Sequence, residues 1–299
     1  MKINSSKINS DSKIVVACSG GSDSLALLAL LNDLDVEIQP IYVDHDTKQA
    51  SKFWKAVKKA CKKLQVPNEP IKLEIEGALG KSNFEEKARN QRYKLLNNWA
   101  KENSYDYVAV GHTIDDQTET VLFNLIRGSV EGLGGMQVFT KNIWRPMLFT
   151  HRKEDTKQIC NENKIKFVDD KANKNSKYAR VQIRSELIPM MNQIMDRDVS
   201  PIIARNSQII RSENHFLNNL AKNSWPKEDE PLAKNLADLD DVVALRAIRM
   251  WIGYPRIRSR DAKRVLDVAR GKSKATQIEG HVRVWRSKGV MYFERKKSK

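Results

Sequence analysis

Six consecutive residues near the N-terminus combine glycines, hydroxyls and a carboxylate: Ser19, Gly20, Gly21, Ser22, Asp23 and Ser24. They follow a short β-branched run, Lys13–Cys18, and precede an apolar stretch, Leu25–Leu34, that predicts a helix. Glycines allow the backbone to turn sharply, and the free N–H groups of a helix N-terminus favour a bound anion. We therefore predict a phosphate-binding loop, in which Asp23 is also a candidate Mg²⁺ ligand. The alternative is an ordinary serine-capped helix that follows a glycine turn.

A second polar string, Gly111–Thr120, follows a later apolar run. Gly111 is expected to allow the close approach of an adenine or ribose at a strand end. Three further side chains recur at intervals that can bring them to one face of a helix: His112, either Asp115 or Asp116, and Glu119. Such a cluster can bind a metal or the positive end of an amino-acid substrate. Alternatively, its carboxylates only complement the dipole of the helix.

The first half of the chain alternates between strand and helix patterns, which predicts an α/β fold with a mainly parallel sheet and helices on both faces. Strands are expected at residues 13–18, 36–43, 71–75, 107–110 and 166–168, with helices at 25–34, 50–64 and 83–103 and another from about 115. Ligands in such sheets bind beyond the carboxyl ends of the strands. The phosphate loop, Asp44-His45 and Gly111-His112 all follow strands, so we expect them to share one site.

Positive charge is concentrated in the second half of the chain. Residues 1–150 contain 20 Lys and Arg against 18 Asp and Glu, whereas residues 151–299 contain 33 against 19. This asymmetry favours a small-molecule site joined to a polyanion-binding surface over a generally lysine-rich surface, which would raise the charge of both halves. Helix patterns predominate after Lys177, and strands are expected within Thr276–Arg295, around a turn at Lys288-Gly289. We predict domains at 1–195 and 196–299, the second smaller, basic and helical/β.

The three cysteines, Cys18, Cys61 and Cys160, form no C-x-x-C pair and are expected to be reduced, packed thiols. No apolar run approaches the roughly 18–20 residues of a membrane span. The polar N-terminus has neither the apolar core nor the cleavage site of a signal peptide. A cytoplasmic protein is therefore expected, and its oligomeric state, monomer or homodimer, stays open.

The string Ser-Gly-Gly-x-Asp-Ser resembles the signature of the N-type ATP pyrophosphatase superfamily, also called the PP-loop family. The resemblance implies that the loop grips the β- and γ-phosphates while ATP is cleaved between its α- and β-phosphates. It also implies that AMP is transferred to an oxygen of the substrate, from which a nitrogen or sulfur nucleophile then displaces it.

Further strings are similar to those of the tRNA(Ile)-lysidine synthase family. They are Tyr42–His45, Asn83–Tyr93 (an E-x-x-A-R-x-x-R-Y helix), Gly111–Thr120, Arg127-Gly128 with Gly132–Met136, Arg145-Pro146, and Tyr178–Arg184. The last of these resembles an R-N-x-I-R element, but Val181 and Gln182 depart from its usual asparagine. Residues 13–190 carry most of the resemblance, and Arg246–Glu294 looks like the first C-terminal domain of longer members.

This resemblance assigns roles to two groups of residues in addition to the phosphate loop and Gly111, which would bind the nucleotide. Catalytic roles fall on Asp44, His45, His112, Asp115, Asp116, Glu119 and Arg127. RNA contacts fall on Arg89, Arg92, Arg145, Arg180 and Arg184. The implied substrates are ATP with Mg²⁺, free L-lysine and tRNA(Ile) with a CAU anticodon. The implied reaction adenylates the wobble cytidine at O2 and then joins the ε-amine of lysine to C2.

Several alternatives stay open at this point. A related tRNA thiolase is expected to carry C-x-x-C cysteines, a small-metabolite amidotransferase leaves the basic half unexplained, and a non-catalytic nucleotide- or RNA-binding protein would keep only a relict loop. Arg89 and Arg92 can instead pair with Glu85 and Glu86 on one helix. The aromatic side chains of the second half can stack on RNA bases or pack in a core: Trp251, Tyr254 and Trp285.

Overall fold

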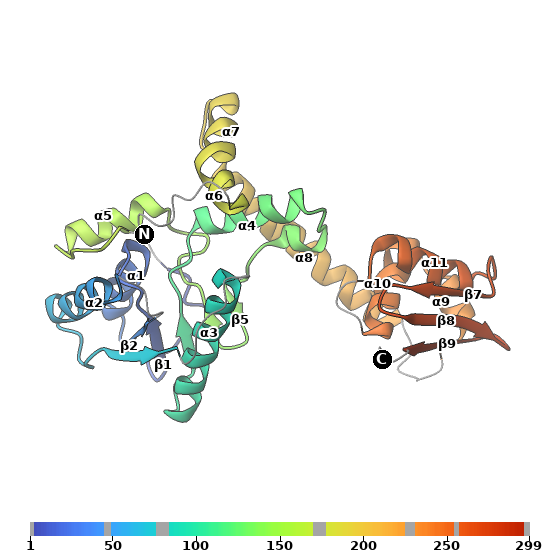
Figure 1. Cartoon of the computed structure of the whole chain (residues 1–299), viewed down its shortest axis with the longest axis horizontal. Coiled ribbons are helices and arrows are strands. Elements are labelled where there is room, and N and C mark those ends of the chain that lie inside the picture. The colour runs from blue at the N-terminus through green and yellow to red at the C-terminus, as the bar shows by residue number, and fades with distance from the viewer. Residues whose placement is uncertain are drawn as a thin grey trace. The chain divides into compact units, whose positions relative to one another are not determined.

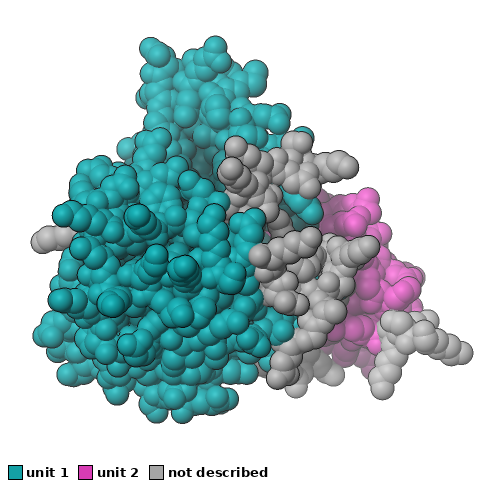
Figure 2. Space-filling model, turned by 60° about the vertical axis from the view of Figure 1, so that its left-hand side comes forward, with its two compact units in different colours: residues 1–208 teal, residues 209–299 magenta. Residues whose placement is uncertain are grey.

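The computed structural model describes residues 3–44, 49–75, 84–169, 178–224, 231–253 and 257–295, except the side chains of residues 84–86 (Figure 1). Contacts within the chain divide it into unit 1, Met1–Gln208, and unit 2, Ile209–Lys299 (Figure 2). The division falls inside the long helix α8, Ser200–Ser224. The functional domains expected at 1–195 and 196–299 stay a prediction.

Unit 1 contains a six-stranded sheet in the order β3-β2-β1-β4-β6-β5. Its strands are β1 (Lys13–Ala17), β2 (Glu37–Asp44), β3 (Ile71–Glu74), β4 (Tyr107–Ala109), β5 (Phe139–Thr140) and β6 (Ile143–Trp144). All neighbours are parallel except β5 and β6. The predicted mainly parallel sheet is therefore confirmed.

Alternation along β1 explains why helices cover both faces of the sheet, because successive side chains of a strand point to opposite sides. Ile14 and Val16 belong to one core cluster with residues of α1 (Ser22–Asn32), α2 (Ala50–Leu64) and α5 (Lys153–Glu162). Val15 belongs to another cluster, with residues of α3 (Phe84–Glu102). The apolar residues of α1 are buried almost all round, as expected of a helix held between the sheet and α5.

The strand order also fixes where a ligand can bind. The chain passes from β1 to β2 on one side, whereas β4 lies on the other side of β1. A switch of this kind opens a crevice at the carboxyl ends of the two central strands. The phosphate loop follows β1 and Gly111 follows β4, so the sequence motifs meet at this crevice.

After β4 the chain forms α4 (Ile114–Ile126), the short turn η1 (Glu131–Gly134) and the β5–β6 hairpin, and then α5. The expected strand at residues 166–168 is wrong. These residues form no strand. The N–H of Val168 donates to the carbonyl oxygen of Gly20 (3.0 Å), but the phosphate loop turns away from residues 166–168 there, so no ladder of hydrogen bonds continues. Beyond them, α6 (Ala179–Gln182), the π-helical turn η3 (Ile183–Leu187) and α7 (Ile188–Met195) pack on α4 through Leu122, Ile183 and Ile188.

In its described residues, unit 2 contains the end of α8, three further helices and an antiparallel sheet, which confirms the predicted helical/β second part. The helices are α9 (Ala233–Ala237), α10 (Asp241–Ile252) and α11 (Ser259–Ala269), and the sheet order is β7 (Ala275–Ile278), β8 (Val282–Ser287), β9 (Val290–Arg295). The predicted turn at Lys288-Gly289 is confirmed, and both residues have positive φ. Among the described helices, none is long and apolar enough to cross a membrane.

Candidate active site

The phosphate loop is closed by the side chain of its last residue. Ser24 Oγ accepts hydrogen bonds from the N–H groups of Ser19 (3.0 Å) and Gly20 (3.2 Å) and lies 3.0 Å from the carbonyl oxygen of Gly21. Gly20 has φ +86°, and a Cβ there would lie 2.8 Å from the carbonyl oxygen of Phe53. Only glycine fits such a position. The chain itself thus shapes the loop, and Ser22 and Asp23 open the first turn of α1, where backbone N–H groups lack helical partners.

Asp23 joins the phosphate loop to α5. The hydroxyl of Thr156 donates to Asp23 Oδ1 over 2.6 Å and lies 2.8 Å from the carbonyl oxygen of Lys153. Burial raises the pKa of Asp23, although the Thr156 hydrogen bond opposes the shift. Within the described ranges, no group of three His, Cys, Asp or Glu side chains is arranged to hold a metal ion. The Mg²⁺ role of Asp23 therefore stays a prediction.

Gly111 brings the segment after β4 directly against the phosphate loop. A Cβ at this position would lie 2.7 Å from the carbonyl oxygen of Asp23 and 3.1 Å from the nitrogen of Ser24. Gly111 therefore has a packing role in the described structure. Its expected contact with the nucleotide stays a prediction. Two residues later Thr113 begins α4, and its N–H and hydroxyl both donate to Asp116 Oδ2 (2.9 and 3.0 Å). This capping box fixes the side chain of Asp116.

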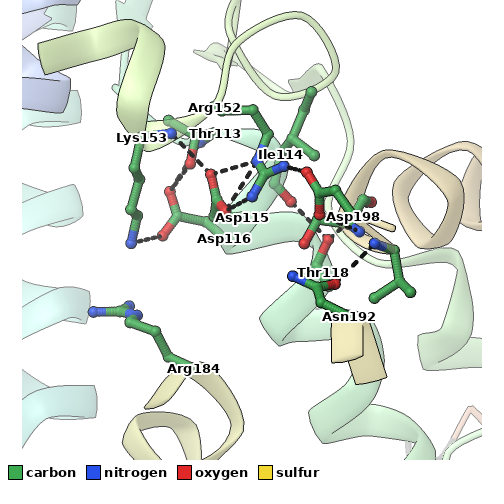
Figure 3. A network of polar contacts seen from close by, with 12 residues as sticks. Thr113, Ile114, Asp115, Asp116, Thr118, Arg152, Lys153, Arg184, Asn192 and Asp198 are labelled. Atoms are coloured by element: carbon green, nitrogen blue, oxygen red, sulfur yellow. Dashed lines mark hydrogen bonds and ion pairs between the residues drawn. The ribbon is translucent and has the colours of Figure 1, made fainter. Parts of the chain in front are cut away.

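The neighbouring carboxylate, Asp115, holds the N-terminus of α5 (Figure 3). Arg152 donates to it from Nε (3.0 Å to each oxygen) and from its terminal nitrogen (2.7 Å), and the backbone N–H of Lys153 donates over 2.8 Å. Arg152 also pairs with Asp198, which precedes α8. Asp115 is therefore occupied in joining helices. The predicted catalytic role of Asp115 is untested, and its contacts are those of a structural residue.

Asp116 and Glu119, one turn apart on α4, face a pair of cations that the sequence analysis did not bring together. Lys153 Nζ lies 3.1 Å from Asp116 Oδ1 and 3.7 Å from Glu119 Oε1. The guanidinium of Arg184 donates to both oxygens of Glu119 (2.5 and 2.8 Å). Glu119 is almost fully buried. Arg184, predicted to contact RNA, is thus already paired with a carboxylate of the site.

Lys153 and Asp116 each stabilise the charge of the other. Burial on its own would raise the pKa of Asp116, but the ammonium of Lys153 and the Thr113 N–H help to lower it to about 2. Burial likewise opposes the charge of Lys153, yet Asp116 and Glu119 raise its pKa above the ordinary value. The arrangement is therefore a pair of carboxylates suited to holding an ammonium group.

His112 belongs to a different group, which gathers predicted RNA-binding residues. Arg145 donates from Nε to His112 Nδ1 (3.2 Å). The guanidinium carbons of Arg89 and Arg92 lie 5.6 and 6.0 Å from the centre of the Tyr93 ring. The side chains of Glu85 and Glu86, the alternative partners of Arg89 and Arg92, lie outside the described residues. Arg145 is buried and also donates to the carbonyl oxygen of Gln137 (3.0 Å) and to Thr140 Oγ1 (3.1 Å). In this arginine cluster, Arg89, Arg92 and Arg145, the first two are therefore the members suited to a phosphate.

The remaining predicted residues lie apart from these two groups. Asp44 ends β2 and pairs with Lys72 of β3 (2.8 Å). His45 lies outside the described residues. Arg127 and Arg180 are exposed, and their guanidinium carbons lie 5.3 and 5.2 Å from the centre of the Phe123 ring on α4. The structure therefore does not bring Arg127 to the phosphate loop.

Three residues at the start of α5 were missed by the sequence analysis: Arg152, Lys153 and Thr156. A signal was available, because α5 follows β6 and its N-terminus must lie at the ligand-binding edge of the sheet. Their contacts to Asp115, Asp116 and Asp23 bridge segments far apart in the chain, which residue spacing does not reveal.

A known protein family matches more than half of the chain. Residues 2–191 match the PP-loop domain family. The chain belongs to the PP-loop domain family. Among curated proteins, this PP-loop chain is 33% identical over 225 residues to a tRNA(Ile)-lysidine synthase from a Nostoc species, covering 70% of the chain and 63% of the relative. It is 40% identical over 195 residues to another from Thermosipho africanus, covering 62% and 45%.

The PP-loop chain thus spans between about half and two thirds of the length of these relatives. Among solved structures, it is similar to the U34-tRNA thiolase NcsA from Methanococcus maripaludis with its [4Fe-4S] cluster. The TM-score is 0.58 at 19% identity, over 71% of this chain and 76% of that one. At this identity the likeness concerns the fold alone.

We expect His112 of this PP-loop chain to stay neutral where ordinary histidines titrate. Burial is the main cause, and Arg89 and Arg145 add to it against the attraction of Asp116, so that the pKa falls to about 3. Nitrogen NMR of the five histidines should show that the imidazole whose signal is lost in His112→Gln remains neutral from about pH 8 to about pH 5. Titration of His112 near pH 6.5 would contradict the structure.

The lowered pKa of His112 also makes the stability of the chain depend on pH. Because the pKa of His112 is lower in the folded than in the unfolded chain, the unfolded state binds the proton more tightly. The free energy of unfolding should therefore fall as the pH drops below about 6.5, and less so in His112→Gln.

Proposed function

We propose that the chain is a tRNA(Ile)-lysidine synthase, which uses ATP to join free L-lysine to the wobble cytidine of tRNA(Ile) with a CAU anticodon. The observation that carries the proposal is the carboxylate pair Asp116 and Glu119, which already holds an alkylammonium group at the same crevice as the phosphate loop. The names of the relatives point to the same reaction.

ATP would bind with its β- and γ-phosphates at the phosphate loop, where the N-terminus of α1 and the Ser22 hydroxyl provide donors. The Asp23 carboxylate lies in the first turn of α1, beside the loop donors. It would therefore suit a Mg²⁺ ion that takes most of its ligands from phosphates and water. Bound there, Mg²⁺ would neutralise charge on the leaving pyrophosphate. The loop donors would act on the same developing charge.

The reaction would then run in two steps. The O2 atom of the cytidine attacks the α-phosphorus of ATP, and pyrophosphate leaves. The ε-amine of lysine attacks C2 of the adenylated base, AMP leaves with the O2 oxygen, and the amine loses a proton. Asp116 and Glu119 would orient lysine through one of its ammonium groups, because the pKa of Asp116 is held well below its usual value and a charged carboxylate favours a cation over a neutral ligand.

The RNA would be bound by two separate groups of cations. The arginine cluster beside His112 offers guanidiniums to a phosphate close to the reacting base. Unit 2 is strongly basic, since residues 209–299 contain 21 Lys and Arg against 11 Asp and Glu. On its sheet Trp285 stacks with Tyr292 at 5.7 Å, with Arg283 over the Trp285 ring. Such a surface suits a nucleic acid.

The positions of the cysteines favour this reaction over tRNA thiolation. Cys18, Cys61 and Cys160 are all buried, and burial raises the pKa of each thiol. Cys18 and Cys61 belong to the apolar core beneath α1, where a thiolate cannot reach a substrate. A non-catalytic role gives no reason for a cation-holding carboxylate pair beside the loop.

The proposed function predicts the products of a single incubation. With tRNA(Ile), labelled lysine and α-phosphate-labelled ATP, the protein should form AMP rather than ADP and transfer lysine to the RNA, as followed by chromatography and mass spectrometry. Withholding lysine should leave the α-phosphate label on the RNA. Formation of ADP, or AMP formation that ignores the tRNA, would overturn the proposal.

A second prediction concerns the arginine cluster. Arg89→Met should weaken tRNA binding and reduce the slope of log affinity against log salt by about one, because one phosphate contact is lost. Lys94→Met is the matched control, since Lys94 is exposed on the same helix. Filter binding over a range of salt concentrations measures both. Equal slopes for the two variants would remove Arg89 from the RNA contacts.

A further inference from the structure

Lys153 occupies the position that the proposed function assigns to the substrate. Its Nζ lies between Asp116 (3.1 Å) and Glu119 (3.7 Å), and its side chain is only 27% exposed. The terminal group of Lys153 is a primary alkylammonium, which is the same group that free lysine carries at its ε-end. The carboxylate pair thus already binds the same functional group that its proposed ligand carries.

We propose that Lys153 is an internal competitor of substrate lysine, holding the carboxylate pair in the absence of substrate and leaving it when lysine binds. This inference rests on the proposed function. Two ammonium groups at one carboxylate pair repel each other, so lysine can bind fully only when Lys153 withdraws. Arg184 does not compete in the same way, because its bidentate contact is with Glu119 alone, whereas Lys153 lies between both carboxylates.

The position of Lys153 allows this withdrawal without loss of the surrounding structure. Its backbone N–H remains bound to Asp115, which anchors α5 independently of the side chain. One turn later Thr156 contacts Asp23 of the phosphate loop, and the charge of Asp23 acts on Lys153. The side chain therefore has a second anionic region close by, and bound ATP phosphates would make that region more negative.

Removal of the competitor should strengthen lysine binding. The apparent dissociation constant equals the intrinsic one divided by the fraction of protein with a free site, and a partly buried ion pair shifts that fraction several-fold. In isothermal titration of L-lysine into the full chain, Lys153→Met should bind roughly 3- to 10-fold more tightly than the wild type. The KM for lysine in tRNA ligation should fall by a similar factor.

Two variants separate this inference from a general effect of charge. Lys157→Met removes a cation from the exposed side of the same helix and should leave the dissociation constant near that of the wild type. Lys153→Arg keeps a cation at the carboxylates and should bind lysine no more tightly than the wild type. Lys153→Gln repeats the test if the methionine variant folds poorly.

Failure of this inference and failure of the proposed function give different results. If Lys153→Met binds lysine no more tightly than Lys157→Met, or if Lys153→Arg gains as much as Lys153→Met, the inference is overturned while lysine ligation by the wild type would still support the proposed function. If the wild-type chain transfers no lysine to tRNA(Ile), the proposed function fails, and the inference fails with it.

Discussion

Asp115 lies between the N-termini of two helices, α4 and α5, and its carboxylate joins them. The positive ends of two helix dipoles repel each other, so their approach requires a negative group between them. Asp115 meets this requirement through its bonds to Arg152 and to the Lys153 N–H. Arg152 extends the connection to Asp198, ahead of α8. The start of α5 is thereby fixed at the ligand-binding edge of the sheet.

The rest of the site depends on that placement. From the anchored end of α5, Lys153 reaches Asp116 and Glu119, and Thr156 reaches Asp23 in the phosphate loop. A nucleotide region and a cation-binding region are thus linked through one helical turn. This connection would suit the proposed two-step transfer, in which the activated base and its nucleophile are held within one crevice. His112, whose pKa is lowered by burial, and the arginine cluster adjoin α3, which carries Arg89 and Arg92.

The sequence was informative wherever local pattern decides structure. Alternating apolar runs predicted the parallel sheet, and the residues after its strands marked the crevice, because both follow from backbone geometry. Spacing could not separate Asp115 from Asp116, since adjacent helical positions differ only in which distant segment they meet. Lys153 and Thr156 stayed hidden for the same reason. The expected strand at 166–168 failed because pairing requires a neighbour that continues in parallel, and the phosphate loop turns away.

A double-mutant cycle on Asp115→Asn and Arg152→Met tests most directly whether this ion pair organises the site. Both side chains are largely buried, at 18% and 25% exposed, so urea unfolding should give a coupling free energy of about 1–3 kcal/mol. The exposed pair of Lys13 and Glu37, at 46% and 43%, provides the comparison and should give no more than about 1 kcal/mol. Each single variant should also lose tRNA-dependent AMP formation. Additive effects on stability with AMP formation intact would contradict the account.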